Sequence, residues 1–130
     1  MILVDTSVLV TYWRSPSKEW QRIFVENEFA ICGVTRAELC HGARHEANLT
    51  EILAALDGFT LVPVDEALWD ELGRLLFTLR ASGCVVSFQD AMIAAVALRH
   101  DLELWTLDAD FKRMSDVIPA LRLYVPNVLS

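Results

Sequence analysis

The sequence predicts an α/β protein in three layers, with helices covering both faces of a mostly parallel central sheet. Short apolar runs of strand length alternate with longer amphipathic segments, which is typical of a parallel sheet with helical connections. No linker, repeat or low-complexity stretch interrupts this alternation. At 130 residues the chain has the size of one domain, so residues 1–130 are expected to share a single core.

Apolar runs predict a sheet of about five strands, at residues 1–4, 29–32, 60–64, 102–106 and 121–125. Asp5 follows the first run and Gly33 follows the second, and both residue types are uncommon inside strands. The third run comes after the turn-forming pair Asp57-Gly58. Because amphipathic segments separate most of the runs, the strands are expected to lie mostly parallel.

Amphipathic spacing predicts helices at residues 16–28, 35–46, 49–56, 65–81, 87–100 and, as a single turn, 110–114. Trp20, Ile23 and Phe24 share one face of the first helix. The longest helix has a stripe of leucines at positions 68, 72, 75, 76 and 79. These faces are expected to pack on the sheet.

Two of the predicted helices begin with the spacing of a capping box, in which the first side chain binds a backbone N–H three residues later. The pairs are Thr35 with Glu38 and Ser87 with Asp90. The acid of each pair is then expected in the first turn, where the helix dipole also favours a negative charge.

The composition indicates a second buried surface besides the core. Hydrophobic residues make up 54% of the chain and the mean hydropathy is +0.35, both high for a small soluble protein. We therefore expect a homodimer or a permanent partner, with Tyr12, Trp13 and Trp69 among the exposed aromatic residues. No apolar run approaches the ~18 residues that span a bilayer, so no membrane contact and a cytoplasmic location are expected.

The cysteines and histidines do not predict a zinc site. Cys32, Cys40 and Cys84 have no metal-binding spacing and lie in apolar surroundings, so they are expected to be reduced, buried thiols. The three histidines are too scattered to complete a ligand set with them.

The charge limits how the protein could bind nucleic acid. A net charge of −7 and an isoelectric point of about 4.8 argue against broad, non-specific binding. Bound cations can nevertheless reverse the local charge of an acidic site. Arg14, Lys18 and Arg22 form one basic group, and Lys112 and Arg113 form another; either group could be an ordinary solvated surface.

Four acidic residues are predicted to meet at the carboxyl edge of the sheet, where parallel α/β proteins bind ligands. Asp5 follows the first strand directly, and Asp108 follows the fourth by two residues. Glu38 lies near the start of the helix that leaves the second strand. Asp90 lies at the start of the helix that precedes the fourth strand, and this helix begins over the same edge because it runs opposite to that strand.

Such a cluster suits Mg²⁺ or Mn²⁺, hard cations that take oxygen ligands. Metal ions held near a phosphodiester activate water, orient it in line and stabilise charge on the leaving oxygen. Neighbouring carboxylates repel one another strongly unless a cation is present. The pattern therefore predicts a metal site that suits phosphodiester hydrolysis.

Each acid also has a structural interpretation. Glu38 and Asp90 could stabilise the starts of their helices, and Asp108 could be the N-cap of the turn at residues 110–114. Asp5 is harder to explain in this way, because a carboxylate at the end of a buried strand is costly without partners. Four separate structural explanations at one edge would be a coincidence, which favours the site.

The same residues carry a resemblance to the PIN-domain ribonucleases, in particular the VapC toxins of bacterial VapBC toxin–antitoxin pairs. Four segments that cover nearly the whole chain resemble the motifs of that group in order, namely ILVDTSVLV, TRAELCHGA, SFQDAMIAA and LWTLDADF. Each segment is weakly specific alone, and the four in order at suitable spacings are fairly specific.

The resemblance implies a PIN-like fold and a Mg²⁺- or Mn²⁺-dependent endoribonuclease that acts as the toxin of a type II toxin–antitoxin system. The implied catalytic and metal-binding residues are Asp5, Glu38, Asp90 and Asp108, with Asp110 as a possible further ligand. The implied supporting residues, which would act by hydrogen bonding, are Thr6, Ser7 and Thr106. The resemblance also implies a homodimer, an RNA substrate and a VapB-type antitoxin.

Two other functions stay open on the sequence. A phosphatase with an aspartate nucleophile would also place Asp5 after its first strand, but Ser7 stands where its second aspartate belongs, and lysine is nearly absent. A non-catalytic binding module could share the fold, although the intact acids favour a nuclease. For the nuclease, Arg14, Arg36 and Lys112 are candidates for RNA contacts near the cleft.

Overall fold

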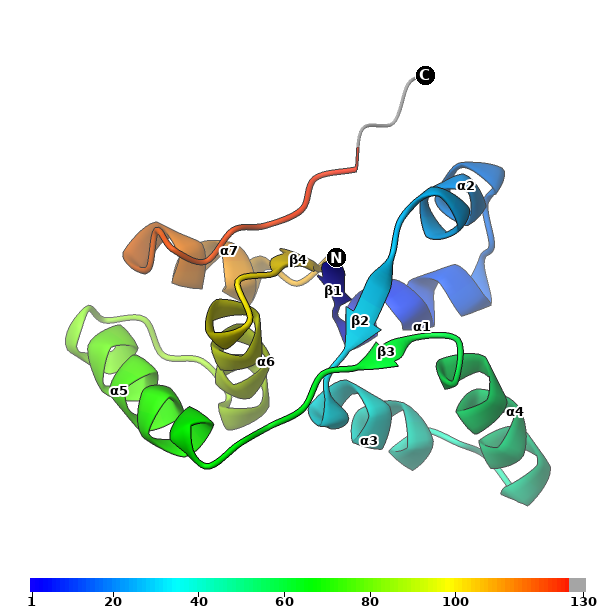
Figure 1. Cartoon of the computed structure of the whole chain (residues 1–130), viewed down its shortest axis with the longest axis horizontal. Coiled ribbons are helices and arrows are strands. Elements are labelled where there is room, and N and C mark those ends of the chain that lie inside the picture. The colour runs from blue at the N-terminus through cyan, green and yellow to red at the C-terminus, as the bar shows by residue number, and fades with distance from the viewer. Residues whose placement is uncertain (127–130) are drawn as a thin grey trace.

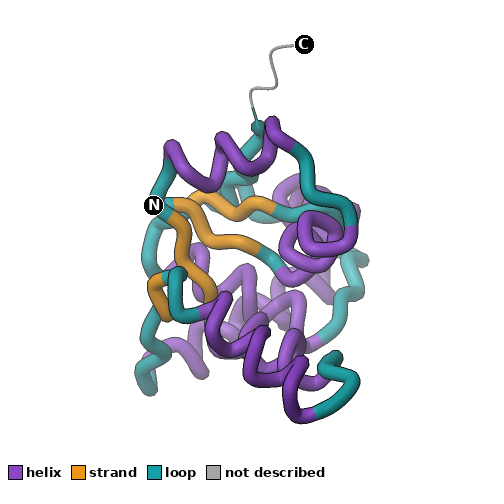
Figure 2. The backbone as a smooth tube through the Cα atoms, turned by 90° about the vertical axis from the view of Figure 1, so that its right-hand side faces the viewer, coloured by secondary structure: helices purple, strands orange, loops and turns teal. Residues whose placement is uncertain are grey.

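The computed structural model of the protein describes residues 1–126 and has a parallel sheet at its centre (Figures 1 and 2). Its four strands are β1 (Ile2–Val4), β2 (Phe29–Ile31), β3 (Thr60–Leu61) and β4 (Glu103–Trp105). They lie in the order β3-β2-β1-β4, and each neighbouring pair is parallel. The predicted α/β class with a parallel sheet is confirmed.

The helices of the described residues are α1 (Thr6–Arg14), α2 (Lys18–Glu26), α3 (Gly33–His41), α4 (Glu46–Leu56), α5 (Ala67–Ala81), α6 (Phe88–Arg99) and α7 (Ala109–Val117). Helices α1 to α4 pack mainly on one face of the sheet and α5 to α7 on the other (Figure 1). This division follows from the strand order. Strands β2 and β3 extend the sheet on one side of β1, whereas β4 lies on its other side, and right-handed crossovers in opposite directions place their helices on opposite faces.

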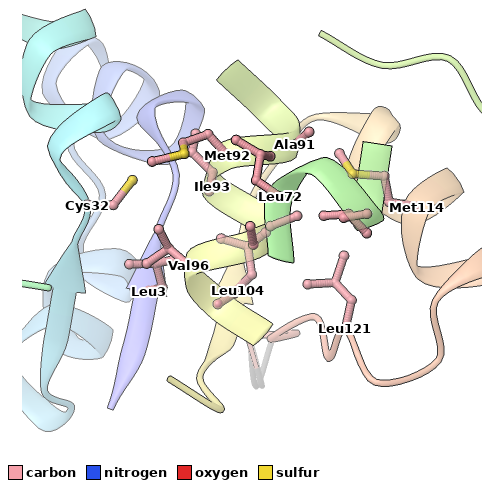
Figure 3. Packing of buried hydrophobic residues seen from close by; sticks show 14 of the residues in the cluster. Leu3, Cys32, Leu72, Ala91, Met92, Ile93, Val96, Leu104, Met114 and Leu121 are labelled. Atoms are coloured by element: carbon pink, nitrogen blue, oxygen red, sulfur yellow. The ribbon is translucent and has the colours of Figure 1, made fainter. Parts of the chain in front are cut away.

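Side-chain alternation along the strands divides the core into two clusters. Leu3 belongs to the cluster under α5 to α7, while its neighbours Ile2 and Val4 belong to the cluster under α1 to α4. Figure 3 shows the first cluster, in which Val96 of α6 lies beside Leu3 of β1. Residues 91–97 of α6 are all buried, so this helix is firmly held against the sheet.

The predicted helices are present, with shifted boundaries. In α5 the leucine stripe faces the core, with Leu68, Leu72, Leu75 and Leu79 buried and Leu76 partly buried. The predicted turn at residues 110–114 is part of a longer helix, α7. Within the described part of the chain, none of the helices is both long and apolar enough to cross a bilayer.

Helix α1 is not among the helices predicted from the sequence. The segment ILVDTSVLV is an almost continuous apolar run, and Val8 and Val10 favour extended structure. The run divides at Asp5, which is the N-cap of α1 and accepts a hydrogen bond from the N–H of Ser7. Burial of Val8 and Leu9 against the sheet stabilises the helix in spite of its modest propensity.

The prediction of a fifth strand is wrong. Residues 121–125 meet β4 at a single parallel bridge, between Leu104 and Leu123. The N–H and the carbonyl of Leu104 each make one hydrogen bond to this segment, at 2.9 and 2.8 Å. The pairing extends no further because β4 is short and Pro126 has no N–H with which to continue the ladder.

The exposed aromatic residues agree only partly with the prediction. Trp13 and Trp69 are exposed, whereas Tyr12 is half-buried. Its ring packs on Phe24 at a centroid distance of 4.9 Å and stacks with Trp20 at 6.4 Å. Tyr12 therefore belongs to the aromatic packing between α1 and α2.

The cysteines form no disulfide. Cys32 and Cys84 are buried as predicted, but Cys40 is only partly buried, so the prediction of burial fails there. Burial raises the pKa of the Cys32 thiol, which keeps it protonated and unreactive near neutral pH.

Candidate metal centre

The candidate site lies at the carboxyl edge of the sheet, between the neighbouring strands β1 and β4. The chain leaves β1 into α1 on one face and leaves β4 into α7 on the other. In parallel α/β proteins, such a reversal of the strand order opens a crevice in which ligands bind. Asp5 and Asp108 follow these two strands, so the fold itself places them at the crevice.

Asp5 is only 4% exposed, and three donors hold its carboxylate. Ser7 donates from its hydroxyl at 2.6 Å and from its N–H at 3.4 Å, and the hydroxyl of Thr106 donates at 2.9 Å. All three bonds end on Oδ2, and within residues 1–126 no hydrogen bond reaches Oδ1. The buried charge is therefore fixed in orientation, with one oxygen left for a further ligand.

The same two hydroxyls join the turn after β4 to the start of α1. The N–H of Leu107 donates to Ser7 Oγ and the N–H of Asp108 donates to Thr106 Oγ1, both at 3.0 Å. Asp108 is also the N-cap of α7, because its Oδ1 accepts a hydrogen bond from the N–H of Asp110 at 2.9 Å. The capping interpretation of Asp108 is therefore correct, and it occupies only one of the two carboxylate oxygens.

Asp90 reaches the same crevice from the first turn of α6. Ser87 is the N-cap of this helix and accepts a hydrogen bond from the N–H of Asp90 at 3.1 Å, as the spacing predicts. One oxygen from each of Asp90, Asp108 and Asp110 lies within 4.8 Å of the other two. We call these three residues the three-aspartate cluster.

Electrostatics identifies the cluster as a place of uncompensated negative charge. Partial burial, and next the charge of Asp108, raise the pKa of Asp90 to about 6, with smaller contributions from Asp5 and Asp110. A hydrogen bond with Ser87 opposes this rise. Arg113, paired with Asp110 at 2.8 Å, offsets only part of the charge.

The donor set of the cluster fits a hard divalent cation. It consists of carboxylate oxygens alone, and within residues 1–126 no other group of acids, histidines or cysteines has this spacing. A cation there would remove the repulsion that raises the pKa of Asp90. The absence of cysteine and histidine from the set argues against zinc.

Glu38 lies outside the three-aspartate cluster, and the capping box predicted for it is wrong. Helix α3 begins at Gly33 with Cys32 as its N-cap, so Thr35 is the third residue of the helix and not its cap. Thr35 is fully buried, and its hydroxyl lies 3.7 Å from Cys32 Sγ. Glu38 is therefore in the second turn, where capping does not explain it. Its exposed carboxylate accepts a hydrogen bond from the hydroxyl of Thr6 at 2.9 Å, which ties α3 to the first residue of α1.

The predicted site residues thus gather in two ways. Asp90, Asp108 and Asp110 approach one another directly, whereas Asp5 and Glu38 are joined to the site through the hydroxyls of Thr106, Ser7 and Thr6. Sequence reasoning did not connect Arg113 with Asp110, although their i,i+3 spacing on one helix is a signal for that ion pair.

The fold and the cluster define a class: parallel α/β proteins that gather carboxylates at the point where the strand order reverses. Within this class, the PIN domain family model matches residues 2–117, and the chain belongs to the PIN domain family. VapC ribonuclease Mb1587 of Mycobacterium bovis is 31% identical over 119 residues, which cover 85% of this chain and 89% of that protein. Ribonuclease VapC1 of Methanocaldococcus jannaschii is 26% identical over 124 residues, covering 95% and 86%.

Solved structures show the same fold. The structure of VapBC-1 from nontypeable Haemophilus influenzae matches with a TM-score of 0.83 and 22% identity, over 95% of this chain and 97% of that one. VapBC-5 from Mycobacterium tuberculosis matches with a TM-score of 0.68 and 27% identity, over 94% and 95%. The predicted PIN-like fold is therefore confirmed.

Proposed function

We propose that this chain is a metal-dependent endoribonuclease and the toxin of a type II toxin–antitoxin pair. The observation that carries the proposal is the three-aspartate cluster, with Asp5 beside it, at the crevice of a PIN-family sheet. The relatives named VapC ribonucleases and the solved VapBC structures support the same function. Membership of this family leaves no support for the phosphatase alternative.

Asp5, Asp90 and Asp108 would hold the metal, with Glu38 and Asp110 as further acids of the site. The metal is Mg²⁺ or Mn²⁺, because both take oxygen ligands, and when bound it supplies an activated water and neutralises charge on the phosphodiester. Ser7 and Thr106 orient the carboxylate of Asp5 through Oδ2. The buried body of α6 holds Asp90 in place, and Thr6 restrains Glu38.

The partner in this proposal is a VapB-type antitoxin, and the chain forms a homodimer in the cytoplasm, with residues 1–130 as one PIN domain. An unneutralised acidic crevice is a strong site for a basic side chain, above all the guanidinium of an arginine. An antitoxin that places an arginine there would exclude the metal and the RNA phosphate together.

Cleavage of RNA by the purified protein tests the function. We expect cleavage with Mg²⁺ or Mn²⁺, none in EDTA, and none by an Asp90→Asn variant with either metal. Undiminished cleavage in EDTA would exclude the metal mechanism. A wild type that binds RNA or an antitoxin but cleaves nothing with any divalent metal would instead identify a binding module.

A further inference from the structure

Arg113 of α7 is the cation that the fold places against the three-aspartate cluster. Its guanidinium donates from Nη1 to Asp110 Oδ1 at 2.8 Å and from Nη2 to the carbonyl of Val85 at 3.4 Å. Within residues 1–126, Asp90 and Asp108 form no ion pair, so Arg113 supplies the one ion pair of the cluster. The proposed function assigns no role to this arginine.

The two contacts of Arg113 join the start of α7 to the segment that enters α6. Val85 lies in the connection between α5 and α6, two residues before Ser87, the N-cap of the helix that carries Asp90. Arg113 and Asp110 are one turn apart on α7, and the planar guanidinium can serve two acceptors at once. A single side chain therefore ties one acid of the cluster to the backbone that leads to another.

The ion pair leaves the cluster short of positive charge and open to a metal. Three carboxylates lie within 4.8 Å of one another and share this one cation. Arg113 and Asp110 are 49% and 40% exposed, so solvent screens their attraction. Within residues 1–126 no hydrogen bond reaches Oδ2 of Asp110, which is therefore left for a further ligand while Oδ1 stays with the arginine.

A fixed cation acts on a metal site in two opposite ways. Without metal, its positive charge offsets the repulsion between the carboxylates and so stabilises the folded protein. When a divalent cation binds, the same charge repels it and competes with it for the shared carboxylate, so the affinity for the metal is lower. The two effects occur together at any physiological pH, because a guanidinium does not lose its proton there.

We propose that Arg113 is a positioning residue of the metal centre, which serves as the counter-cation of the metal-free cluster and lowers the affinity of that cluster for a divalent metal. In the metal-free protein it holds Asp110 and the segment before α6 in place. The inference rests on the proposed metal-dependent function and adds what sets the affinity for the metal.

Arg122 offers a matched control on the amino side of β4. Its side chain is 50% exposed and donates to Asp101 Oδ1 at 2.9 Å and to the carbonyl of Asp101 at 3.0 Å. This pair joins the turn before β4 to the segment after α7, away from the acids at the carboxyl edge of the sheet. Arg122→Gln therefore removes the same charge and a similar ion pair without touching the cluster.

Binding of Mn²⁺ tests the effect of Arg113 on the metal. Free Mn²⁺ is measured by electron paramagnetic resonance while wild type, Arg113→Gln, Arg113→Lys and Arg122→Gln are titrated without RNA. We expect Arg113→Gln to bind Mn²⁺ about 3- to 10-fold more tightly than wild type, because it removes a unit charge beside a divalent cation. Arg113→Lys keeps the charge and should bind Mn²⁺ like wild type, as should Arg122→Gln.

Thermal unfolding tests the effect of Arg113 on the metal-free protein. In EDTA, Arg113→Gln should melt about 2–5 °C below wild type and also below Arg122→Gln, because the carboxylates lose their counter-charge. In saturating Mn²⁺ this deficit should shrink, since the variant binds the metal more tightly and gains more stability from it. A residue with a structural role alone would give the same deficit in both solutions.

The outcomes separate this inference from the function on which it rests. If wild type binds no Mn²⁺, the metal centre and the role of Arg113 fail together. If wild type binds Mn²⁺ while Arg113→Gln binds it equally well or more weakly, the role of Arg113 is refuted and the metal-dependent function stands. An equal loss of melting temperature in EDTA and in Mn²⁺, or the same changes in Arg122→Gln, would also refute it.

Discussion

At the scale of single residues, Asp90 combines a helix position with a charge that the fold disfavours. It occupies the first turn of α6, where the helix dipole stabilises an acid, yet burial and neighbouring acids raise its pKa to about 6. In the metal-free protein, burial and the neighbouring acids therefore destabilise the charged form of Asp90 by more than the helix dipole stabilises it. This balance determines the sign of the first prediction.

Asp90→Asn is expected to stabilise the metal-free protein by about 1 kcal/mol and to abolish RNA cleavage, because it removes a charge that partial burial disfavours and that Asp108 and Asp5 repel. Asp70→Asn is the control, since Asp70 is also a first-turn acid, on α5. It should lose about 0.5 kcal/mol through the helix dipole alone. Melting curves in EDTA and in Mg²⁺ measure the stability of Asp90→Asn, Asp70→Asn and wild type. Mg²⁺ should stabilise Asp90→Asn less than it stabilises wild type.

An Asp90→Asn protein that melts below wild type in EDTA, still cleaves RNA and gains as much from Mg²⁺ would limit Asp90 to a role at the helix start.

The pH dependence of stability follows from the same residue. Its pKa of about 6 in the folded protein exceeds the ordinary value of 3.8, so the folded state keeps a proton that the unfolded chain has lost. The stability from this proton is complete below about pH 4 and is lost as the pH rises to about 6. Unscreened, the shift corresponds to about 3 kcal/mol, and solvent screening at this partly exposed position reduces it to about 1 kcal/mol.

Unfolding of wild type and Asp90→Asn in EDTA between pH 4 and 7.5 measures this difference. The wild type should lose stability relative to the variant over that interval, and parallel curves would contradict the raised pKa.

Thr106 connects the two strands of the crevice, because its hydroxyl donates to Asp5 and accepts from the N–H of Asp108. Thr106→Val keeps the shape and loses both bonds. We expect a loss of about 1–2 kcal/mol in stability and roughly 10- to 100-fold in cleavage, since the carboxylate of Asp5 loses an orienting donor. Thr106→Ser should recover most of both. A valine variant as active as wild type would show that Ser7 alone orients Asp5.

At the scale of elements, α6 positions the site through its rigidity and its start. Residues 91–97 are buried, and Ser87 caps the first turn that carries Asp90. Helix α2 has the same kind of cap, because Ser17 accepts a hydrogen bond from the N–H of Trp20 at 3.1 Å. Helix α2 carries no residue of the candidate metal centre. The two serines form a natural comparison.

Ser87→Ala and Ser17→Ala are each expected to lower stability by about 1 kcal/mol, the usual cost of losing an N-cap. Only Ser87→Ala should also reduce cleavage and weaken the stabilisation by Mg²⁺, because the first turn that holds Asp90 then frays. Parallel melting and cleavage assays measure both effects. Equal cleavage by the two variants would show that the cap does not position the site.

At the scale of the whole molecule, the apolar excess of the sequence is found partly on the surface. On α5, Trp69 is 54% exposed and Phe77 is 65% exposed, while the leucine stripe of the same helix is buried. Gly73 lies between them, and a methyl group added at its Cα would meet no atom within 4 Å. The outer face of α5 is therefore open to a partner surface.

The predicted homodimer can be tested on this face. Wild type should sediment as a dimer at micromolar concentration, and Phe77→Glu should shift it toward monomer, because a charge in an apolar interface is costly to bury. Val25→Glu is the control, since Val25 is 79% exposed and lies on α2. A monomeric wild type would refute the homodimer, and a dimeric Phe77→Glu would move the interface away from α5.

Local patterns account for most of what the sequence predicted correctly. Strand and helix alternation, the leucine stripe of α5 and the cap at Ser87 each depend on residues close together in the chain, so their physical causes are visible in the sequence. The same locality explains the errors. Thr35 and Glu38 have the spacing of a capping box, but their helix begins two residues earlier, at Gly33. Helix α1 was missed because it lies inside an almost continuous apolar run.

The sequence by itself determined the α/β class, the parallel sheet and the carboxyl edge as the place where acids follow strands. Only the tertiary structure decided how those acids meet. Thr106 and Asp5 are 101 positions apart, and their hydrogen bond exists because β4 lies beside β1, an order that no local pattern encodes. The division between the three-aspartate cluster and the hydrogen-bonded Asp5 and Glu38 has the same cause, since packing across the sheet sets the distances between distant segments.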